Sequence, residues 1–246
     1  MVIVGDRTPP AQSGSARVAH VDFLGAPAPF AQGPFILASL LDCPVYLCFC
    51  LRQGQGYRII FVHVPSSQMS MFIYIVMAAW AGVGLAFNTR LSGMMAAALA
   101  PTGALFAFLS LLTGSLWGKP MWGTWWVWDA RLTSTLILLF FYLGFLALQS
   151  SIDDPRRADK ACAVLALVGV VNVPIIYFSV NWWNTLHQGA SVSLTRAPSM
   201  ATPMLWGMLI MVLAFWMYAI AAALARVRNI ILERERHTDW VKNAVE

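Results

Sequence analysis

The sequence predicts an all-α protein, a polytopic membrane helical bundle of about six transmembrane helices with an extracytoplasmic tryptophan-rich loop. Of its 246 residues, 59 % are hydrophobic and only 11 % are charged. Five runs without Asp, Glu, Lys or Arg each exceed the roughly 20 residues that cross a hydrocarbon core. These runs are residues 59–89, 91–118, 132–152, 161–195 and 197–225. Backbone groups in lipid must be paired within helices or a closed barrel, and the runs lack the alternation of barrel strands.

The first 65 residues carry weaker membrane signals than the rest of the chain. Residues 1–29 are polar and contain many small residues, which predicts an N-terminal tail. Residues 30–51 are a candidate first crossing, although Asp42 and Pro44 near its middle are costly in a membrane. Residues 52–65 are predicted to form a connection. The transmembrane domain is therefore expected to cover residues 30–228, followed by a charged cytoplasmic tail at 229–246.

Start and stop signals divide the remaining chain into helices. Ser66 or Ser67 is the expected N-cap of the first, and Asp129 suits the positive end of the third. Residues 153–160 are predicted to be a water-exposed loop, and Pro174 to kink the helix that follows. Thr202 is the predicted N-cap of the last helix, with Pro203 after it. The predicted helices cover about 66–87, 92–115, 129–149, 161–181 and 203–226.

Charge and cysteine content exclude several classes of function. The net charge is +5, but the basic residues stand at helix ends, where the positive-inside rule explains them without nucleic acid. No cysteines form a CxxC pair, so we interpret them as packing residues rather than a metal or redox site. They are Cys43, Cys48, Cys50 and Cys162. The sequence has no Walker A motif, which predicts no ATPase activity.

Counting crossings places three segments on one side of the membrane. Two crossings separate His63 from the tryptophan stretch, residues 117–131, and four separate His63 from His187. The Lys and Arg residues then indicate which side this is, because eleven of the 16 fall opposite these segments, with Arg7 and Arg17 counted on the premise that residues 30–51 span. The five on the same side are Arg52, Arg58, Lys119, Arg131 and Arg196. The positive-inside rule therefore predicts that the tryptophan and histidine loops are extracytoplasmic.

The tryptophan stretch is the most unusual segment of the chain. Five of the 11 tryptophans lie in it, beside Gly and Pro and outside a regular hydrophobic period. They are Trp117, Trp122, Trp125, Trp126 and Trp128. Tryptophan also collects at membrane interfaces where nothing binds. Five indoles so close together nevertheless favour a broad apolar surface for a large flat ligand.

Two histidines on the side of the tryptophan stretch are candidate metal ligands. Imidazole binds iron through one ring nitrogen while the other donates a hydrogen bond. His63 and His187 on opposite faces of a porphyrin would give six-coordinate iron. The alternatives are an amphipathic surface histidine and a zinc site, for which two histidines alone are too few ligands. His20 and His237 lie in the tails and are interpreted as solvated.

Three charged residues complete the candidate site. Haem propionates are anionic and favour guanidinium partners, for which Arg58 and Arg131 are candidates because they flank His63 and end the tryptophan stretch. An arginine that extends its side chain to the membrane surface is the alternative for each. Asp129 is expected to cap its helix or to orient a tryptophan N–H, and capping is favoured.

Three motifs resemble the cytochrome c maturation protein C (CcmC) family. Residues 122–129, Trp-Gly-Thr-Trp-Trp-Val-Trp-Asp, resemble the tryptophan-rich "WWD" signature of haem-handling proteins, and the flanking residues 114–121 and 130–134 resemble the CcmC family. Residues 57–65 (Tyr-Arg-Ile-Ile-Phe-Val-His-Val-Pro) and 182–189 (Trp-Trp-Asn-Thr-Leu-His-Gln-Gly) resemble the family's histidine loops. The resemblance runs from about residue 56 to 230, and the chain departs from the family pattern before about residue 55.

The resemblance implies a six-helix protein of the bacterial inner membrane, with both termini cytoplasmic. Such a protein presents haem b on its outer face, with His63 and His187 as axial ligands. It passes the haem to a membrane-anchored periplasmic haem chaperone. Its implied partners are the ABC-transporter subunits of the cytochrome c maturation system and a small single-span subunit. The resemblance implies binding and transfer of haem rather than an enzyme.

Two other classes of function compete with this interpretation. A permease or channel subunit for another apolar solute would carry ionisable residues inside its spans, and the predicted spans contain none apart from Asp42. A purely structural scaffold would leave His63 and His187 unexplained.

Overall fold

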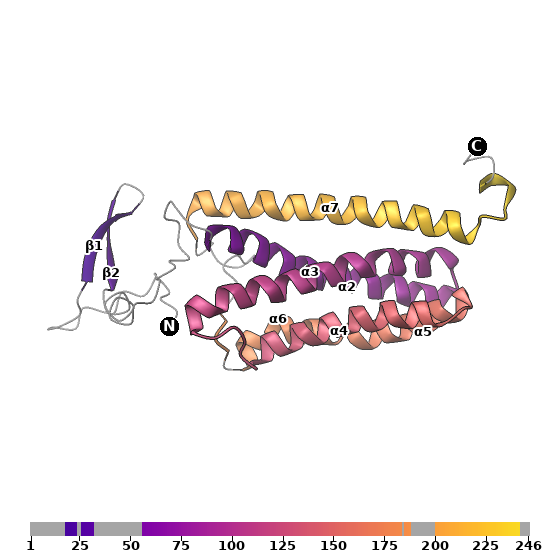
Figure 1. The fold of residues 1–246 in the computed structure, drawn as a ribbon, viewed down its shortest axis with the longest axis horizontal. Coiled ribbons are helices and arrows are strands. Elements are labelled where there is room, and N and C mark those ends of the chain that lie inside the picture. Colours follow the sequence, from indigo (N-terminus) through magenta and orange to yellow (C-terminus); the bar gives the residue numbers. More distant parts are fainter. Residues whose placement is uncertain (1–17, 24–25, 32–55, 184, 188–199, 242–246) are drawn as a thin grey trace.

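The computed structural model of the chain describes residues 18–23, 26–31, 56–183, 185–187 and 200–241, with side chains from residue 59 onward. Its helices run side by side along one axis (Figure 1). They are α2 (Gly56–Phe87), α3 (Arg90–Trp122), α4 (Ala130–Ser151), α5 (Pro155–Gly169), α6 (Asn172–Trp182) and α7 (Thr202–Arg234). The prediction of an all-α membrane helical bundle is confirmed.

Five helical segments of the described chain are long and apolar enough to cross a membrane. They are Ile59–Phe87, Arg90–Trp122, Ala130–Ser151, Pro155–Trp182 and Thr202–Arg234. The candidate first crossing at 30–51 lies, from residue 32 on, outside the described residues. The segments before it form a two-stranded antiparallel hairpin, β1 (Val18–Phe23) and β2 (Ala26–Ala31), which pairs Val18 with Ala31 and Phe23 with Ala26. The composition of a polar tail did not predict this hairpin, to which Val and Phe bring strand propensity.

Two helices extend further toward the tryptophan stretch than predicted. Helix α2 begins at Gly56 and contains Pro65, so His63 lies on a helix and not in a connection. Helix α3 contains Pro120 and continues to Trp122, so Trp117 and Trp122 are helical. Both predicted boundaries were wrong: Ser66 and Ser67 lie inside α2 instead of capping it, and α3 continues past residue 115. In apolar surroundings a helix pairs backbone groups that would otherwise stay unpaired. The one hydrogen bond that a proline near the helix end cannot donate costs less than leaving those groups unpaired.

Three predictions at the other helix ends also need correction. Most residues of the predicted loop 153–160 are exposed as expected, but Ala158 is buried and residues 155–160 form the start of α5, which Asp154 caps by accepting a hydrogen bond from the Arg156 N–H at 3.1 Å. The predicted helix 161–181 is interrupted between α5 and α6 at residues 170–171. Pro174 explains this position, because it cannot donate to the carbonyl four residues earlier, that of Val170. The N-cap of α7 is Ala201, and Thr202 is the first helical residue.

Helix α3 is the centre of the bundle and packs through small side chains. Ala98, Ala100, Thr102 and Ala107 are fully buried. Gly103 lies so close to Tyr142 of α4 that a Cβ there would overlap the Tyr142 ring. The Tyr142 hydroxyl in turn donates a 2.7 Å hydrogen bond to the Ser70 carbonyl of α2. Small residues on membrane helices allow this close approach.

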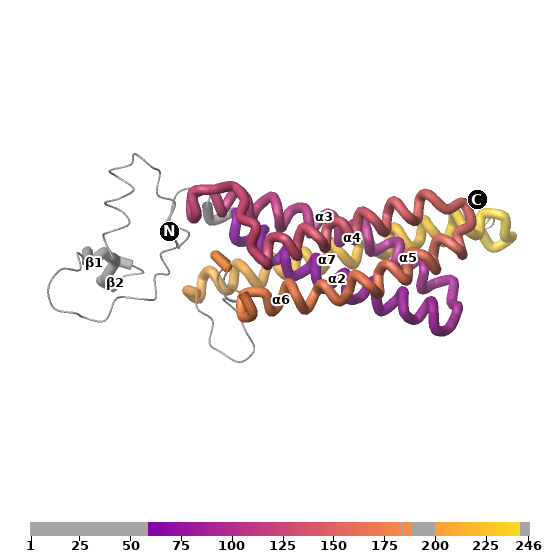
Figure 2. The backbone as a smooth tube through the Cα atoms, turned by 90° about the horizontal axis from the view of Figure 1, so that it is seen from below, coloured from indigo at the N-terminus to yellow at the C-terminus, as the bar shows by residue number. Residues whose placement is uncertain are grey.

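Helix α7 is the least covered of the spans and contains an unexpected charge. Of its apolar 18-residue stretch, only 17 % is buried inside the bundle, against 61 % for the corresponding stretch of α3. Figure 2 shows α7 running along the same axis as the other helices. Because α7 continues to Arg234, Arg226 lies inside a span, where its guanidinium donates to the Thr102 hydroxyl of α3. The expectation that the spans carry no ionisable residue besides Asp42 is therefore wrong for the last span, which contains Arg226 and, nearer its end, Arg228, Glu233 and Arg234.

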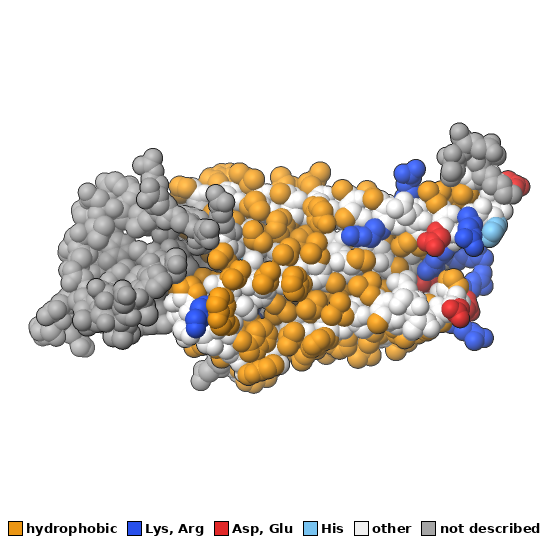
Figure 3. All heavy atoms as spheres, in the orientation of Figure 1, with side chains coloured by type: hydrophobic (Ala, Val, Ile, Leu, Met, Phe, Trp, Pro, Cys, Tyr) orange, Lys and Arg blue, Asp and Glu red, His pale blue; other side chains and the backbone are white. Residues whose placement is uncertain are grey.

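The side chains on the bundle surface are distributed as a bilayer requires. Figure 3 shows apolar side chains over the length of the bundle and most of the visible charges at the end where α5 begins and α7 ends. Cys162 is buried and donates to the Phe145 carbonyl at 3.5 Å, as expected of a packing residue. Cys43, Cys48 and Cys50 lie outside the described residues.

Candidate functional site

The predicted site residues lie at the end of the bundle where α2 begins, α3 ends, α4 begins and α6 ends (Figure 1). The ring centroids of His63 and Trp117 are 6.0 Å apart. Those of Trp122 and His187 are 4.9 Å apart and edge-to-face. The fold therefore brings both histidines and the tryptophan stretch to the same end, as the number of crossings between them requires.

His63 is held by one face of α3. Its Nδ1 is 3.0 Å from the Ser110 carbonyl and 3.1 Å from the Thr113 hydroxyl. A carbonyl only accepts, so Nδ1 carries the proton and donates, and Nε2 is the unprotonated nitrogen. Gly114 faces the ring, and a Cβ there would lie 3.1 Å from the His63 Cε1. Ser110, Thr113, Gly114 and Trp117 share the α3 face toward His63 because they are three, four and seven residues apart.

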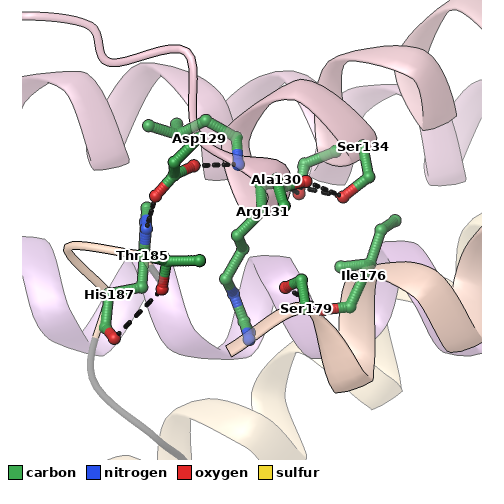
Figure 4. A network of polar contacts seen from close by, with 10 residues as sticks. Asp129, Ala130, Arg131, Ser134, Ile176, Ser179, Thr185 and His187 are labelled. Atoms are coloured by element: carbon green, nitrogen blue, oxygen red, sulfur yellow. Dashed lines mark hydrogen bonds and ion pairs between the residues drawn. The ribbon is translucent and has the colours of Figure 1, made fainter. Parts of the chain in front are cut away.

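His187 is held by a carboxylate (Figure 4). Its Nδ1 is 3.0 Å from Asp129 Oδ2, and the two side chains are only 10 % and 5 % exposed. The other oxygen, Asp129 Oδ1, accepts from the Leu132 N–H at 2.8 Å and so caps α4. The predicted capping role of Asp129 is confirmed. Its second oxygen orients His187, and not a tryptophan N–H.

The Asp129 carboxyl is stabilised in its charged form. Burial by itself would raise the pKa of Asp129. The hydrogen bonds from His187 and from the backbone of Leu132 and Leu186 outweigh burial and hold this pKa below its usual value. A charged carboxylate only accepts, so the His187 Nδ1 must carry a proton, and in the neutral ring Nε2 is again the unprotonated nitrogen.

Both histidines thus have the same chemical arrangement. In each ring Nδ1 is used for a hydrogen bond, and Nε2 has no hydrogen-bond partner among the described residues. A metal-bound histidine in proteins generally donates its second ring N–H to a carboxylate or a carbonyl. His63 and His187 are also near enough for their charges to interact, and Arg131 acts electrostatically on the same ring of His63. The described residues hold no group of three or more His, Cys, Asp or Glu that could bind a metal, so zinc gains no further ligand there.

The tryptophan stretch forms the outer part of the site. Helix α3 ends at Gly123, whose φ of 77° lies in the left-handed region that glycine favours. In the segment that follows, Trp126 meets Trp128 edge-to-face at 5.4 Å. Trp125 is 55 % exposed and Trp128 is 75 % exposed. Lys119 Nζ lies 5.8 Å from the centroid of the Trp125 ring. The segment therefore presents exposed aromatic faces beside the two histidines.

Three donors of the site have no acceptor among the described residues. The indole Nε1 atoms of Trp122 and Trp126 are buried without a hydrogen-bond partner there. Arg131 extends from the first turn of α4 toward α6 (Figure 4), and its guanidinium forms no hydrogen bond or ion pair with a described residue. Buried donors are normally paired, because an unpaired one costs about 1–3 kcal/mol. Such donors suit an anionic ligand.

Sequence reasoning missed several residues of the site, and one predicted residue is not tested. Arg58 lies in the first turn of α2, but its side chain is outside the described part of the chain. Trp182 and Trp183 end α6 half-exposed, with Trp182 stacked on Phe178 at 5.2 Å. Ser110 and Thr113 could have been found from their helical spacing to Trp117. His237, at the opposite end, is exposed.

Known proteins resemble this chain over most of its length. The sequence profile of the family described as Heme exporter protein C matches residues 35–242. The chain is 48 % identical over 195 residues to Heme exporter protein C of Escherichia coli K12, which covers 79 % of this chain and 78 % of that protein. It is 51 % identical over 183 residues to Heme exporter protein C of Bradyrhizobium diazoefficiens, covering 74 % of this chain and 70 % of that protein. A Marchantia polymorpha protein, provisionally named a ccmC-like mitochondrial protein of cytochrome c biosynthesis, is 52 % identical over 142 residues, 58 % of this chain and 60 % of that protein.

Proposed function

The chain belongs to the Heme exporter protein C family, and from this premise we propose that it binds haem at the tryptophan and histidine end of the bundle and presents it for c-type cytochrome biogenesis. The observation that carries the proposal is the common arrangement of His63 and His187. Each uses Nδ1 for a hydrogen bond and leaves Nε2 for a metal. Haem is the cargo of this chain, and any chemical change of the haem takes place on the partners that receive it.

Each residue of the site has a distinct part in holding haem. His63 and His187 are the axial ligands, one from a helix and one from a loop. Arg131, and Arg58 with it, offers a guanidinium to the propionates. The Arg131 guanidinium has no ion pair with a described residue, and the buried indole N–H groups of Trp122 and Trp126 have no acceptor among the described residues. The flat apolar faces support the macrocycle. They are those of Trp117, Trp122, Trp125, Trp126 and Trp128.

The exposed position of the site suits delivery. Trp125 and Trp128 are more than half exposed, so a second protein can reach the edge of the haem, which a closed pocket would prevent. We propose that the receiver is a membrane-anchored periplasmic haem chaperone. The ABC-transporter subunits of the cytochrome c maturation system and a small single-span subunit assist it. Transfer requires that the complex with the receiver binds haem more tightly than the resting site does.

The distribution of Lys and Arg supports a bacterial inner-membrane location with the tryptophan and histidine loops in the periplasm. The rival function, a permease for another apolar solute, is not favoured. Arg226 lies inside the last span, and its guanidinium is held by Thr102. The other charged residues of α7, Arg228, Glu233 and Arg234, follow it toward the helix end that lies away from the tryptophan and histidine site.

A visible spectrum of the purified full chain tests the proposal. Wild-type protein should show a six-coordinate low-spin haem signal, and pyridine haemochrome analysis should identify non-covalent haem b. His63→Ala and His187→Ala should each lose the low-spin signal. His237→Ala is the matched control, since it removes an exposed histidine at the other end. A wild-type protein that supports cytochrome c assembly while binding no haem would refute the proposal, as would low-spin haem that survives in both alanine variants.

A further inference from the structure

A pocket lies at the end of the bundle opposite the tryptophan and histidine site. It has a volume of about 400 Å³ and lies where α2 ends, α3 and α5 begin and α7 ends. In Figure 3 this is the end at which the charged side chains gather next to the apolar surface of the spans. Nothing in the proposed haem site uses this pocket.

The inner walls of the pocket are largely apolar. Helix α2 lines it with Ala81, Gly84 and Leu85, which share one helical face because they are three and four residues apart, and Asn88 lines it just past the helix end. The buried Phe145 of α4 contributes a further apolar wall. Leu85 is 38 % exposed. The apolar side of the pocket is therefore continuous with the lipid-facing surface of α2.

The rim of the pocket carries three cations without partners. Arg90, Arg156 and Lys160 line it, are exposed, and form no ion pair with a described residue. They come from the first turn of α3 and the first two turns of α5. At the boundary between spans and water, such a group of cations attracts anionic headgroups.

The acidic residues of the pocket are already engaged. Asp159 forms a two-pronged ion pair with Arg234, at 2.7 and 2.9 Å, which ties the end of α7 to α5. The Asp154 carboxylate caps α5 and lies 3.5 Å from Arg157, which does not line the pocket. Glu235 accepts from the Trp240 indole at 2.9 Å. The charged residues that line the pocket are four cations and three carboxylates, so its net charge is +1, and the side chains of Arg90, Arg156 and Lys160 take no part in these contacts.

We propose that this pocket binds the headgroup of an anionic phospholipid. The phosphate would lie among Arg90, Arg156 and Lys160, and an acyl chain would follow the apolar face of α2 past Leu85. An amphipathic pocket that opens to the bilayer fits a lipid better than a free phosphate, which would leave the apolar wall unused. The lipid would contact α2, α3 and α5 beside the Asp159–Arg234 pair that anchors α7.

Binding of short-chain lipids to the full chain in detergent tests this proposal. Native mass spectrometry can measure the dissociation constant of dihexanoyl-phosphatidylglycerol, with dihexanoyl-phosphatidylcholine and sodium phosphate as comparison probes. Arg156→Gln/Lys160→Gln should weaken phosphatidylglycerol binding roughly 25-fold, at about fivefold per cation. Arg228→Gln/Arg236→Gln is the matched control. It removes two exposed cations outside the pocket and should change binding by less than about twofold.

A second pair of variants tests the apolar wall. It also keeps the proposal testable if the Arg156→Gln/Lys160→Gln variant fails to fold. Leu85→Trp fills the pocket, whereas Val83→Trp enlarges a side chain of similar exposure, 39 %, that does not line it. Only Leu85→Trp should weaken lipid binding. Equal affinity for the two lipids, displacement of phosphatidylglycerol by millimolar phosphate, or unchanged binding in both pocket variants would overturn the proposal. The haem spectrum should be unaltered throughout, so failure here leaves the haem proposal intact.

Discussion

Replacing Asp129 by Asn tests how the carboxylate sets the orientation and tautomer of His187. The two side chains have nearly the same shape, but Asn has one acceptor oxygen where Asp has two. In the wild type, Oδ1 accepts from the Leu132 N–H and Oδ2 accepts from the His187 Nδ1. If the Asn oxygen keeps the cap, its NH₂ group faces Nδ1. His187 must then accept at Nδ1 and carry its proton on Nε2, the nitrogen that we assign to iron.

The size of the effect follows from these two contacts. Loss of a hydrogen-bonding partner behind a metal-bound histidine typically costs about 10- to 100-fold in affinity. If the Asn side chain instead turns its oxygen toward His187, the cap of α4 is lost, at about 1 kcal/mol of stability. We therefore expect Asp129→Asn to weaken haem binding about 10- to 100-fold, with the protein still folded.

Haem titration of the apoprotein, followed by absorption spectroscopy, measures this loss directly. Thr113→Val is the matched control on the other ligand, since the Nδ1 of His63 keeps the Ser110 carbonyl as acceptor. It should lower haem affinity by no more than about fivefold, because a single neutral hydrogen bond contributes about 1 kcal/mol. Wild-type haem affinity and an unchanged low-spin spectrum in Asp129→Asn would show that the carboxylate does not position His187.

Three further predictions concern stability, pH and the propionates. Gly103→Ala should lower the melting temperature, because the added Cβ would overlap the Tyr142 ring and overpacking costs about 1–3 kcal/mol. The control, Gly82→Ala, should leave the melting temperature nearly unchanged, because the nearest neighbour of its Cβ would be 3.7 Å away. Because the pKa of Asp129 is lowered in the folded protein, its carboxylate stabilises the fold fully above the ordinary pKa of about 3.9. Melts from pH 7 to pH 3 should therefore show the wild type losing its advantage over Asp129→Asn only below about pH 4; loss near pH 6 would contradict this. Arg131→Ala should reduce haem retention while the low-spin spectrum persists, and loss of that spectrum would argue against a propionate partner.

The spans could be predicted because they depend on local sequence. An uncharged run long enough to cross a bilayer must pair its backbone groups within a helix, whatever its neighbours are. The cap at Asp129 is equally local, since its acceptor and the Leu132 N–H are three residues apart. Helix boundaries near prolines were less predictable. Pro65 and Pro120 lie inside helices, because the membrane environment outweighs the loss of one hydrogen bond.

The amino-acid sequence alone determined the membrane helices, and through the number of crossings it determined that His63, the tryptophan stretch and His187 share one end. It did not determine which groups hold the two histidines. The partners of His63 lie 47 and 50 residues away, on α3, and the partner of His187 lies 58 residues away. Such pairs depend on how helices pack and rotate against one another. Only the packed bundle places a carbonyl behind one imidazole and a carboxylate behind the other, because hydrogen bonds act over about 3 Å and residue spacing fixes no distance between separate helices.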